Sequence, residues 1–98
     1  MANTAVGFIE AEGFVPIFDA IDSIVKAVDV TVHGIIRLGG GLVALAVSGD
    51  LAAVEEAVEI GEETAKAISG RPVSSIVFAN PCDAVGALAR NTAVLDGS

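Results

Sequence analysis

The side chains best suited to nucleophilic or acid–base chemistry are scarce in this chain, which has one histidine, His33, and one cysteine, Cys82. His33 has no second His or Cys at the spacing of metal ligands, and Cys82 follows Pro81 without a surrounding redox or metal-binding motif. No set of acid, base and nucleophile can be assembled from these two residues. The sequence therefore predicts a structural histidine, a small half-buried thiol, and a protein that is not an enzyme and holds no metal or other cofactor.

Five glutamates lie close together in the second half of the chain: Glu55, Glu56, Glu59, Glu62 and Glu63. They fall in a segment with helical periodicity, largely on its polar side, where charged side chains are normally solvated. We interpret this cluster as a solvated helix surface rather than as a binding site.

Three consecutive glycines, Gly39–Gly41, separate two apolar runs. They lack the spacing of both the P-loop and the dinucleotide-binding glycine motif, and they join strand to strand instead of strand to helix. Glycine supplies the positive φ angles that tight connections require. The pattern favours a short hairpin turn over a phosphate-binding loop.

Apolar periodicity predicts four strands, over residues 3–11, 30–38, 42–48 and 73–79. A first helix follows Gly13 and Pro16, and its apolar positions are Ile17, Ile21, Ile24, Val25 and Val28. A second helix starts at Asp50 as N-cap and stops at Gly70. Its apolar stripe is Val54, Val58, Gly61, Ala65 and Ile68.

The order of these segments is β-α-β-β-α-β, which indicates an α+β, ferredoxin-like sandwich. Residues 80–90 read as a turn and a short C-terminal helix, so that one domain spans residues 3–90 and a polar tail spans residues 91–98. Alternation in the strand at 30–38 predicts one face with Val30, Val32, Ile36 and Leu38, and another with Thr31, His33 and Arg37.

Composition limits the partners. The chain has 98 residues, of which 53% are hydrophobic and 18% charged, so part of its apolar surface is expected to face another subunit. A formal charge of −8 disfavours nucleic acid and anionic membranes. The longest uncharged run, residues 38–49, is too short to cross a bilayer, and no signal peptide is recognisable. These features predict a soluble, cytoplasmic protein.

Four motifs in order resemble the BMC-domain family, the tiling shell proteins of bacterial microcompartments. They are "GFIE" from Gly7, "DSIVKA" from Asp22, "RLGGG" from Arg37 and "VSGDLAAVEEAV" from Val47. The likeness spans about residues 5–79. It implies cyclic hexamers that tile into facets around enclosed enzymes, together with other shell proteins.

The resemblance also implies functional residues. Arg37, Leu38, Gly39, Gly40 and Gly41 match the loop that lines the central pore, with Gly40 where many relatives carry serine. Such a pore would pass small polar or anionic metabolites. Lys26 matches a lysine at the hexamer edge. Two further edge positions differ from the family: Asp29 stands where the family often has asparagine, and Asn80 stands where it commonly has arginine.

Two alternatives remain open at this point. A PII-like or ACT-type regulatory module could use the same fold to bind small molecules between subunits, and a small enzyme is a weaker rival. The motifs do not distinguish a carboxysome from a catabolic metabolosome.

Overall fold

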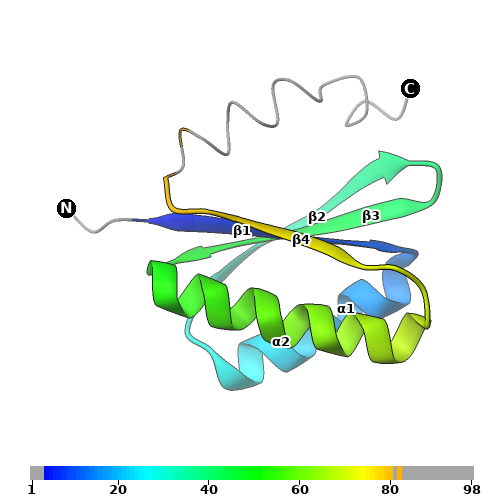
Figure 1. Cartoon of the computed structure of the whole chain (residues 1–98), viewed down its shortest axis with the longest axis horizontal. Coiled ribbons are helices and arrows are strands. Elements are labelled where there is room, and N and C mark those ends of the chain that lie inside the picture. The colour runs from blue at the N-terminus through cyan, green and yellow to red at the C-terminus, as the bar shows by residue number, and fades with distance from the viewer. Residues whose placement is uncertain (1–3, 81, 83–98) are drawn as a thin grey trace.

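One four-stranded antiparallel sheet carries two helices on one of its faces (Figure 1). The computed structural model describes residues 4–80 and 82. Its elements are β1 (Ala5–Glu12), α1 (Phe14–Ala27), β2 (Thr31–Gly39), β3 (Leu42–Gly49), α2 (Leu51–Ser69) and β4 (Ser74–Phe78). The strand order is β2-β3-β1-β4, which confirms the predicted β-α-β-β-α-β sandwich. The predicted C-terminal helix and tail lie outside the described residues.

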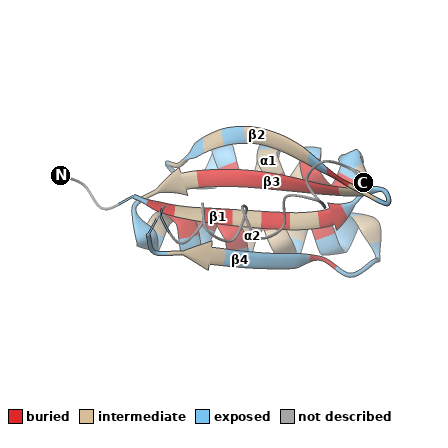
Figure 2. Cartoon of the chain, turned by 90° about the horizontal axis from the view of Figure 1, so that it is seen from above, coloured by how far each residue is buried: buried red, intermediate tan, exposed pale blue. Residues whose placement is uncertain are grey.

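The core lies between the sheet and the helices. Of the two central strands, β1 buries every second residue, whereas β3 is buried continuously from Val43 to Val47 (Figure 2). Ile17 and Ile24 of α1 and Val54 of α2 complete the core from the helix side, each with no exposed surface. This arrangement is the one that half-buried strands and amphipathic helices produce.

Two glycines allow the layers to approach closely. A Cβ atom on Gly7 of β1 would lie 2.6 Å from Val58 Cγ2, and one on Gly61 of α2 would lie 2.5 Å from Ile9 Cδ1 and 2.8 Å from Ile24 Cδ1. The missing side chain at Gly7 therefore allows α2 to pack closely on the sheet. The missing side chain at Gly61 allows α2 to pack closely on both the sheet and α1.

β2 departs from the predicted alternation. Its pairing with β3 shifts at His33, which is an extra residue in the strand. Val32 and Ile35 both pack against the core. The predicted grouping of Ile36 with Val32 is therefore wrong, because the irregularity at His33 inverts the alternation, and Arg37 lies on the helix-covered face with Ile35.

The helix ends are close to those predicted. α2 stops at Gly70, whose φ of 65° is left-handed and whose N–H donates to the Lys66 carbonyl at 3.0 Å. Asp50 occupies the N-cap position, but its side chain makes no capping hydrogen bond. Ile68, predicted in the buried stripe, is 51% exposed. No helix in residues 4–80 is long and apolar enough to span a bilayer.

Candidate functional site

The three-glycine turn presents only backbone at the tip of the β2–β3 hairpin. Gly39, Gly40 and Gly41 have φ angles of 88°, 62° and 84°, values that residues with a side chain rarely adopt. A Cβ atom on Gly40 or Gly41 would meet nothing within 4 Å, so both positions border open space. The N–H of Gly13, at the start of α1, donates to the Gly41 carbonyl at 2.9 Å and anchors the turn.

The two residues before the turn are placed differently from each other. The Arg37 guanidinium carbon lies 5.9 Å from the centre of the Phe14 ring, beside the first turn of α1. Leu38 is only 9% exposed, so most of its side chain is enclosed within the subunit. The pore assignment of all five residues, Arg37 to Gly41, stays a prediction, with the three glycines at the exposed tip.

The predicted edge residues lie at the other end of the subunit. The turn joins the end of β2 to the start of β3. At the opposite end of the sheet α1 leads into β2, and β3 and β4 terminate (Figure 1). Lys26 is near the end of α1, Asp29 is in the loop that follows, and Asn80 comes after β4. The predicted pore and edge residues are therefore separated by the length of the sheet.

Each edge residue has a defined local environment. Lys26 Nζ donates to Asp22 Oδ2 at 2.9 Å, and this hydrogen bond, with the attraction between the charges, raises the pKa of Lys26. The Lys26 side chain is nevertheless 73% exposed. Asn80 Oδ1 accepts a hydrogen bond from the Cys82 N–H at 2.8 Å, which fixes the turn after β4. Asp29 is exposed.

His33 and Cys82, the residues best suited to acid–base or nucleophilic chemistry, are not part of a catalytic arrangement among the described residues. His33 Nε2 is hydrogen-bonded to Ser48 Oγ on the neighbouring strand, which fits a structural histidine. Cys82 is exposed, so the prediction of a half-buried thiol is wrong: the turn that holds its backbone leaves the residue at the surface.

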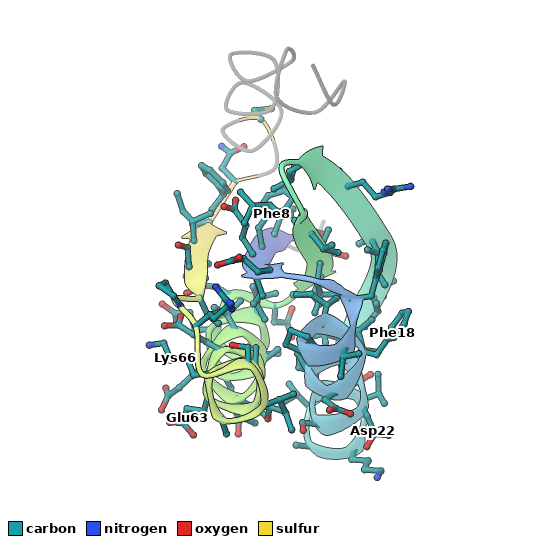
Figure 3. The ribbon with its side chains drawn as sticks, turned by 90° about the vertical axis from the view of Figure 1, so that its right-hand side faces the viewer. Phe8, Phe18, Asp22, Glu63 and Lys66 are labelled. Carbon is teal, nitrogen blue, oxygen red and sulfur yellow. The ribbon has the colours of Figure 1, made fainter. Side chains whose placement is uncertain are left out.

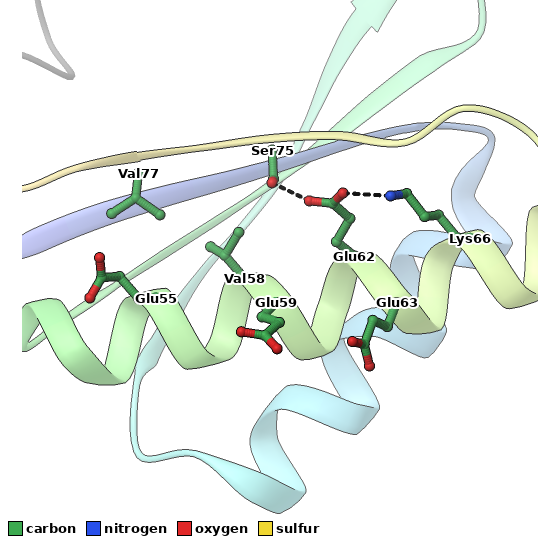
Figure 4. Close-up of a pocket in the computed structure, with 8 residues that line it drawn as sticks. All are labelled: Glu55, Val58, Glu59, Glu62, Glu63, Lys66, Ser75 and Val77. Atoms are coloured by element: carbon green, nitrogen blue, oxygen red, sulfur yellow. Dashed lines mark hydrogen bonds and ion pairs between the residues drawn. The ribbon is translucent and has the colours of Figure 1, made fainter.

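A groove between α2 and β4 gathers part of the glutamate cluster (Figure 4). Its volume is about 400 Å³, and its walls are Glu55, Val58, Glu59, Glu62, Glu63, Lys66, Ser75 and Val77. The Glu62 carboxylate accepts hydrogen bonds from Ser75 and, at 2.8 Å, from Lys66. The hydrogen bond from Lys66 has the largest effect, and together with the one from Ser75 it lowers the pKa of Glu62. With its side chain only 26% exposed, Glu62 is not part of a fully solvated surface.

α1 carries apolar side chains on its exposed surface. Phe14, Phe18 and Val25 are 40%, 54% and 54% exposed, and the two phenylalanine rings stack with centres 5.9 Å apart. Figure 3 shows Phe18 pointing away from α2. Val25 was predicted in the buried stripe with Ile24, so for Val25 that prediction is wrong.

Comparison with known proteins gives consistent results. The BMC domain family matches residues 5–81. The carboxysome shell protein CcmK2 of Synechocystis is 41% identical over 81% of this chain and 78% of the relative. The bacterial microcompartment shell protein EutM of Salmonella typhimurium is 40% identical over 79% of each chain.

A solved structure of a microcompartment protein from Desulfitobacterium hafniense superposes with a TM-score of 0.68 at 23% identity. The match covers 79% of this chain and 41% of the other, so it supports the fold alone.

Proposed function

This chain belongs to the BMC-domain family and is a shell protein of bacterial microcompartments, and we propose that its subunits form cyclic hexamers that tile into facets and carry a central pore. The supporting comparisons are the match over residues 5–81 and relatives at 40–41% identity that are themselves shell proteins. Its place is accordingly in the shell of such a compartment.

One observation about the subunit carries the hexamer and pore proposal. The three-glycine turn and the residues Lys26, Asp29 and Asn80 lie at opposite ends of the sheet. A flat ring with a central opening needs one end of each subunit at the symmetry axis and the other at the rim. The subunit supplies both, with a slender turn for the axis and an exposed lysine for the rim.

The turn suits a pore because it offers no side chain. Around a symmetry axis, Gly39–Gly41 would contribute rings of backbone groups, and N–H groups in successive positive-φ residues can form concave sites for anions. We infer that the opening passes small polar or anionic metabolites.

The relatives and the surroundings of the histidine support a structural rather than a catalytic role for this chain. The relatives that match are structural shell proteins, and His33 is engaged with Ser48 on the sheet. Other shell proteins and enclosed enzymes are its proposed partners.

Electron microscopy of the purified protein, with its mass in solution by light scattering, tests the proposal. We expect a six-subunit mass and hexagonal arrays. A dimer or trimer whose thermal midpoint rises with a nucleotide or an amino acid would contradict it and favour a PII-like or ACT-type regulatory module.

A further inference from the structure

We propose that Gly13 is a positioning residue for the pore: its backbone N–H holds the Gly41 carbonyl, so that the three-glycine turn offers the opening more N–H groups than carbonyl groups. A residue outside the turn then sets the preference of the pore for anions over cations. This inference rests on the proposed function and adds to it the residue that determines its charge selectivity.

The bond between Gly13 and Gly41 removes an acceptor from the turn. Glu12 pairs with Leu42 at the end of the β1–β3 ladder, so Gly13 lies opposite Gly41, and its N–H donates to the Gly41 carbonyl at 2.9 Å. Within the described part of the chain, the N–H groups of Gly40 and Gly41 and the Gly40 carbonyl have no backbone partner. Two N–H groups therefore stay free at the tip against one carbonyl.

Backbone conformation alone explains why position 13 is a glycine. Gly13 has a φ of 85° and a ψ of 164°, a combination essentially restricted to glycine. A Cβ atom there would meet nothing within 4 Å, so no neighbouring atom requires the small residue. This conformation lets the chain turn into α1 while the N–H of Gly13 stays bonded to the turn.

The charged groups around the turn act in the same direction. The Arg37 guanidinium lies against the Phe14 ring, and no carboxylate of the described residues forms an ion pair with it. Glu12, beside the turn, has its Oε1 at 3.7 Å from Arg71 Nη1. The cation before the turn is thus left without a counter-charge in the subunit, whereas the nearby carboxylate has one.

The kind of backbone group at a constriction determines which ions it stabilises. Rings of carbonyl oxygens replace the hydration shell of cations, whereas concave sets of N–H groups bind anions. In a ring every subunit repeats the same turn, so a carbonyl withheld in one subunit is withheld all around the axis. Release of the Gly41 carbonyl would balance the free N–H groups with an equal number of carbonyls and weaken the preference for anions.

Gly13→Ala tests this role, because alanine disfavours a φ of 85° and the N–H then leaves the Gly41 carbonyl. The measurement is the entry of iodide and of thallium(I) into shells that contain this chain, each followed by a sealed dye that the ion quenches. We expect Gly13→Ala to slow the entry of iodide and to speed the entry of thallium(I). A change in the width of the opening alone would move both rates in the same direction.

Gly70→Ala is the matched control. Gly70 also has a positive φ, 65°, and a Cβ atom there would also meet nothing within 4 Å. Its N–H likewise donates to a backbone carbonyl, that of Lys66, at 3.0 Å. Because this bond closes the end of α2 and holds no group of the turn, both rates should equal those of unaltered shells.

A single-atom variant keeps the test independent of the strain that alanine introduces. Replacement of Gly13 by glycolic acid, through ligation of synthetic segments, puts an ester oxygen in place of the N–H and keeps the conformational freedom of glycine. We expect the same opposite shifts in the two rates, also where Gly13→Ala does not assemble. The corresponding ester at Gly70 is its control, and circular dichroism establishes that each variant folds.

The outcomes separate this inference from the proposed function. If the unaltered chain forms no ring, or if its shells admit neither ion, the proposed function fails. If the shells admit both ions and the two Gly13 variants leave the ratio of the rates unchanged, or shift both rates in the same direction, the pore stands and the role of Gly13 is overturned.

Discussion

At the scale of single residues, the absence of a side chain at Gly40 has a direct physical reading. Its φ of 62° is left-handed, and a Cβ atom there would meet nothing within 4 Å. A substitution at Gly40 is therefore strained by its backbone conformation and not by a clash, so that new side-chain atoms extend into free space.

We expect Gly40→Asn to keep the fold and to slow the passage of small anions through assembled shells, because asparagine tolerates left-handed φ while its side chain narrows the opening. A reporter enzyme sealed in shells, compared with the same enzyme after shell disruption, measures the flux. Gly70→Asn is the control, because Gly70 has nearly the same φ, 65°, and lies at the end of α2 outside the turn. Equal flux through Gly40→Asn and unaltered shells would contradict the pore assignment.

Glu62 gives a pH prediction. Hydrogen bonds from Lys66 and Ser75 lower its folded pKa below the ordinary value of 4.5, so the ionised carboxylate stabilises the fold. That contribution is complete above the unfolded pKa and is lost as pH falls through the folded pKa. Glu62→Gln should therefore be less stable than the unaltered chain at pH 7, and the difference should shrink below about pH 4.5.

Urea unfolding at a fixed protein concentration, from pH 7 downward, measures this difference. Glu63→Gln, on the same helix but outside the bonds between Ser75, Glu62 and Lys66, is the control. A difference for Glu62→Gln that stays constant to pH 3 would show that its partners do not stabilise the ionised form.

At the scale of the elements, the distance between layers depends on Gly7 and Gly61. Alanine in place of a strand or helix glycine normally stabilises by about 0.5–1 kcal/mol, through reduced backbone entropy. Here the added Cβ would lie 2.6 Å from Val58 Cγ2 at Gly7, and 2.5 Å from Ile9 Cδ1 at Gly61. The clash opposes the gain at both sites, but the neighbours differ in how far they can move.

We expect Gly7→Ala to destabilise by about 1–3 kcal/mol, and more than Gly61→Ala. Val58 is β-branched in a helix and has one favoured rotamer, whereas the Ile9 Cδ1 at Gly61 is the end of a longer side chain. Urea unfolding of both variants tests the order. In a further test, Ile9→Val, which removes Cδ1, should recover part of the stability lost in Gly61→Ala. A double-mutant cycle without coupling between the two substitutions would show that this contact does not limit how closely α2 approaches the sheet.

Element order was predictable because helix and strand periods are local properties of the sequence. The glycines at Gly39–Gly41 and Gly70 mark two of the chain reversals, the β2–β3 turn and the end of α2. Two details were not. The extra residue at His33 depends on the pairing of β2 with β3, which no period within β2 reveals. The hydrogen bond between Ser75 and Glu62 joins two segments whose proximity exists only after folding.

At the scale of the whole molecule, the two ends of the sheet have different predicted contacts. The three-glycine turn is assigned to the axis, and Lys26, 73% exposed and paired with Asp22, to the rim. The motifs made both assignments possible from the sequence. The exposure of Val25 was not predicted, because apolar spacing along a helix does not show which of its apolar positions the rest of the chain covers.

We predict that Lys26→Ala leaves hexamers intact but impairs the growth of sheets, because it removes an exposed cation from the proposed rim without changing the core of the subunit. Lys26→Asp should have the larger effect, since it adds a like charge near Asp22. Light scattering reports the hexamer and electron microscopy the sheets. Asp19→Ala, on the same helix but farther from its end, is the control, and extended sheets from both Lys26 variants would reject the edge assignment.

The hydrogen bond from the Gly13 N–H to the Gly41 carbonyl connects two elements of the subunit. Gly13 precedes the first residue of α1, and Gly41 belongs to the turn proposed to border the pore. A substitution that shifts the start of α1 is therefore expected to move this turn and to change the diameter of the pore, even when no residue at the opening has been replaced.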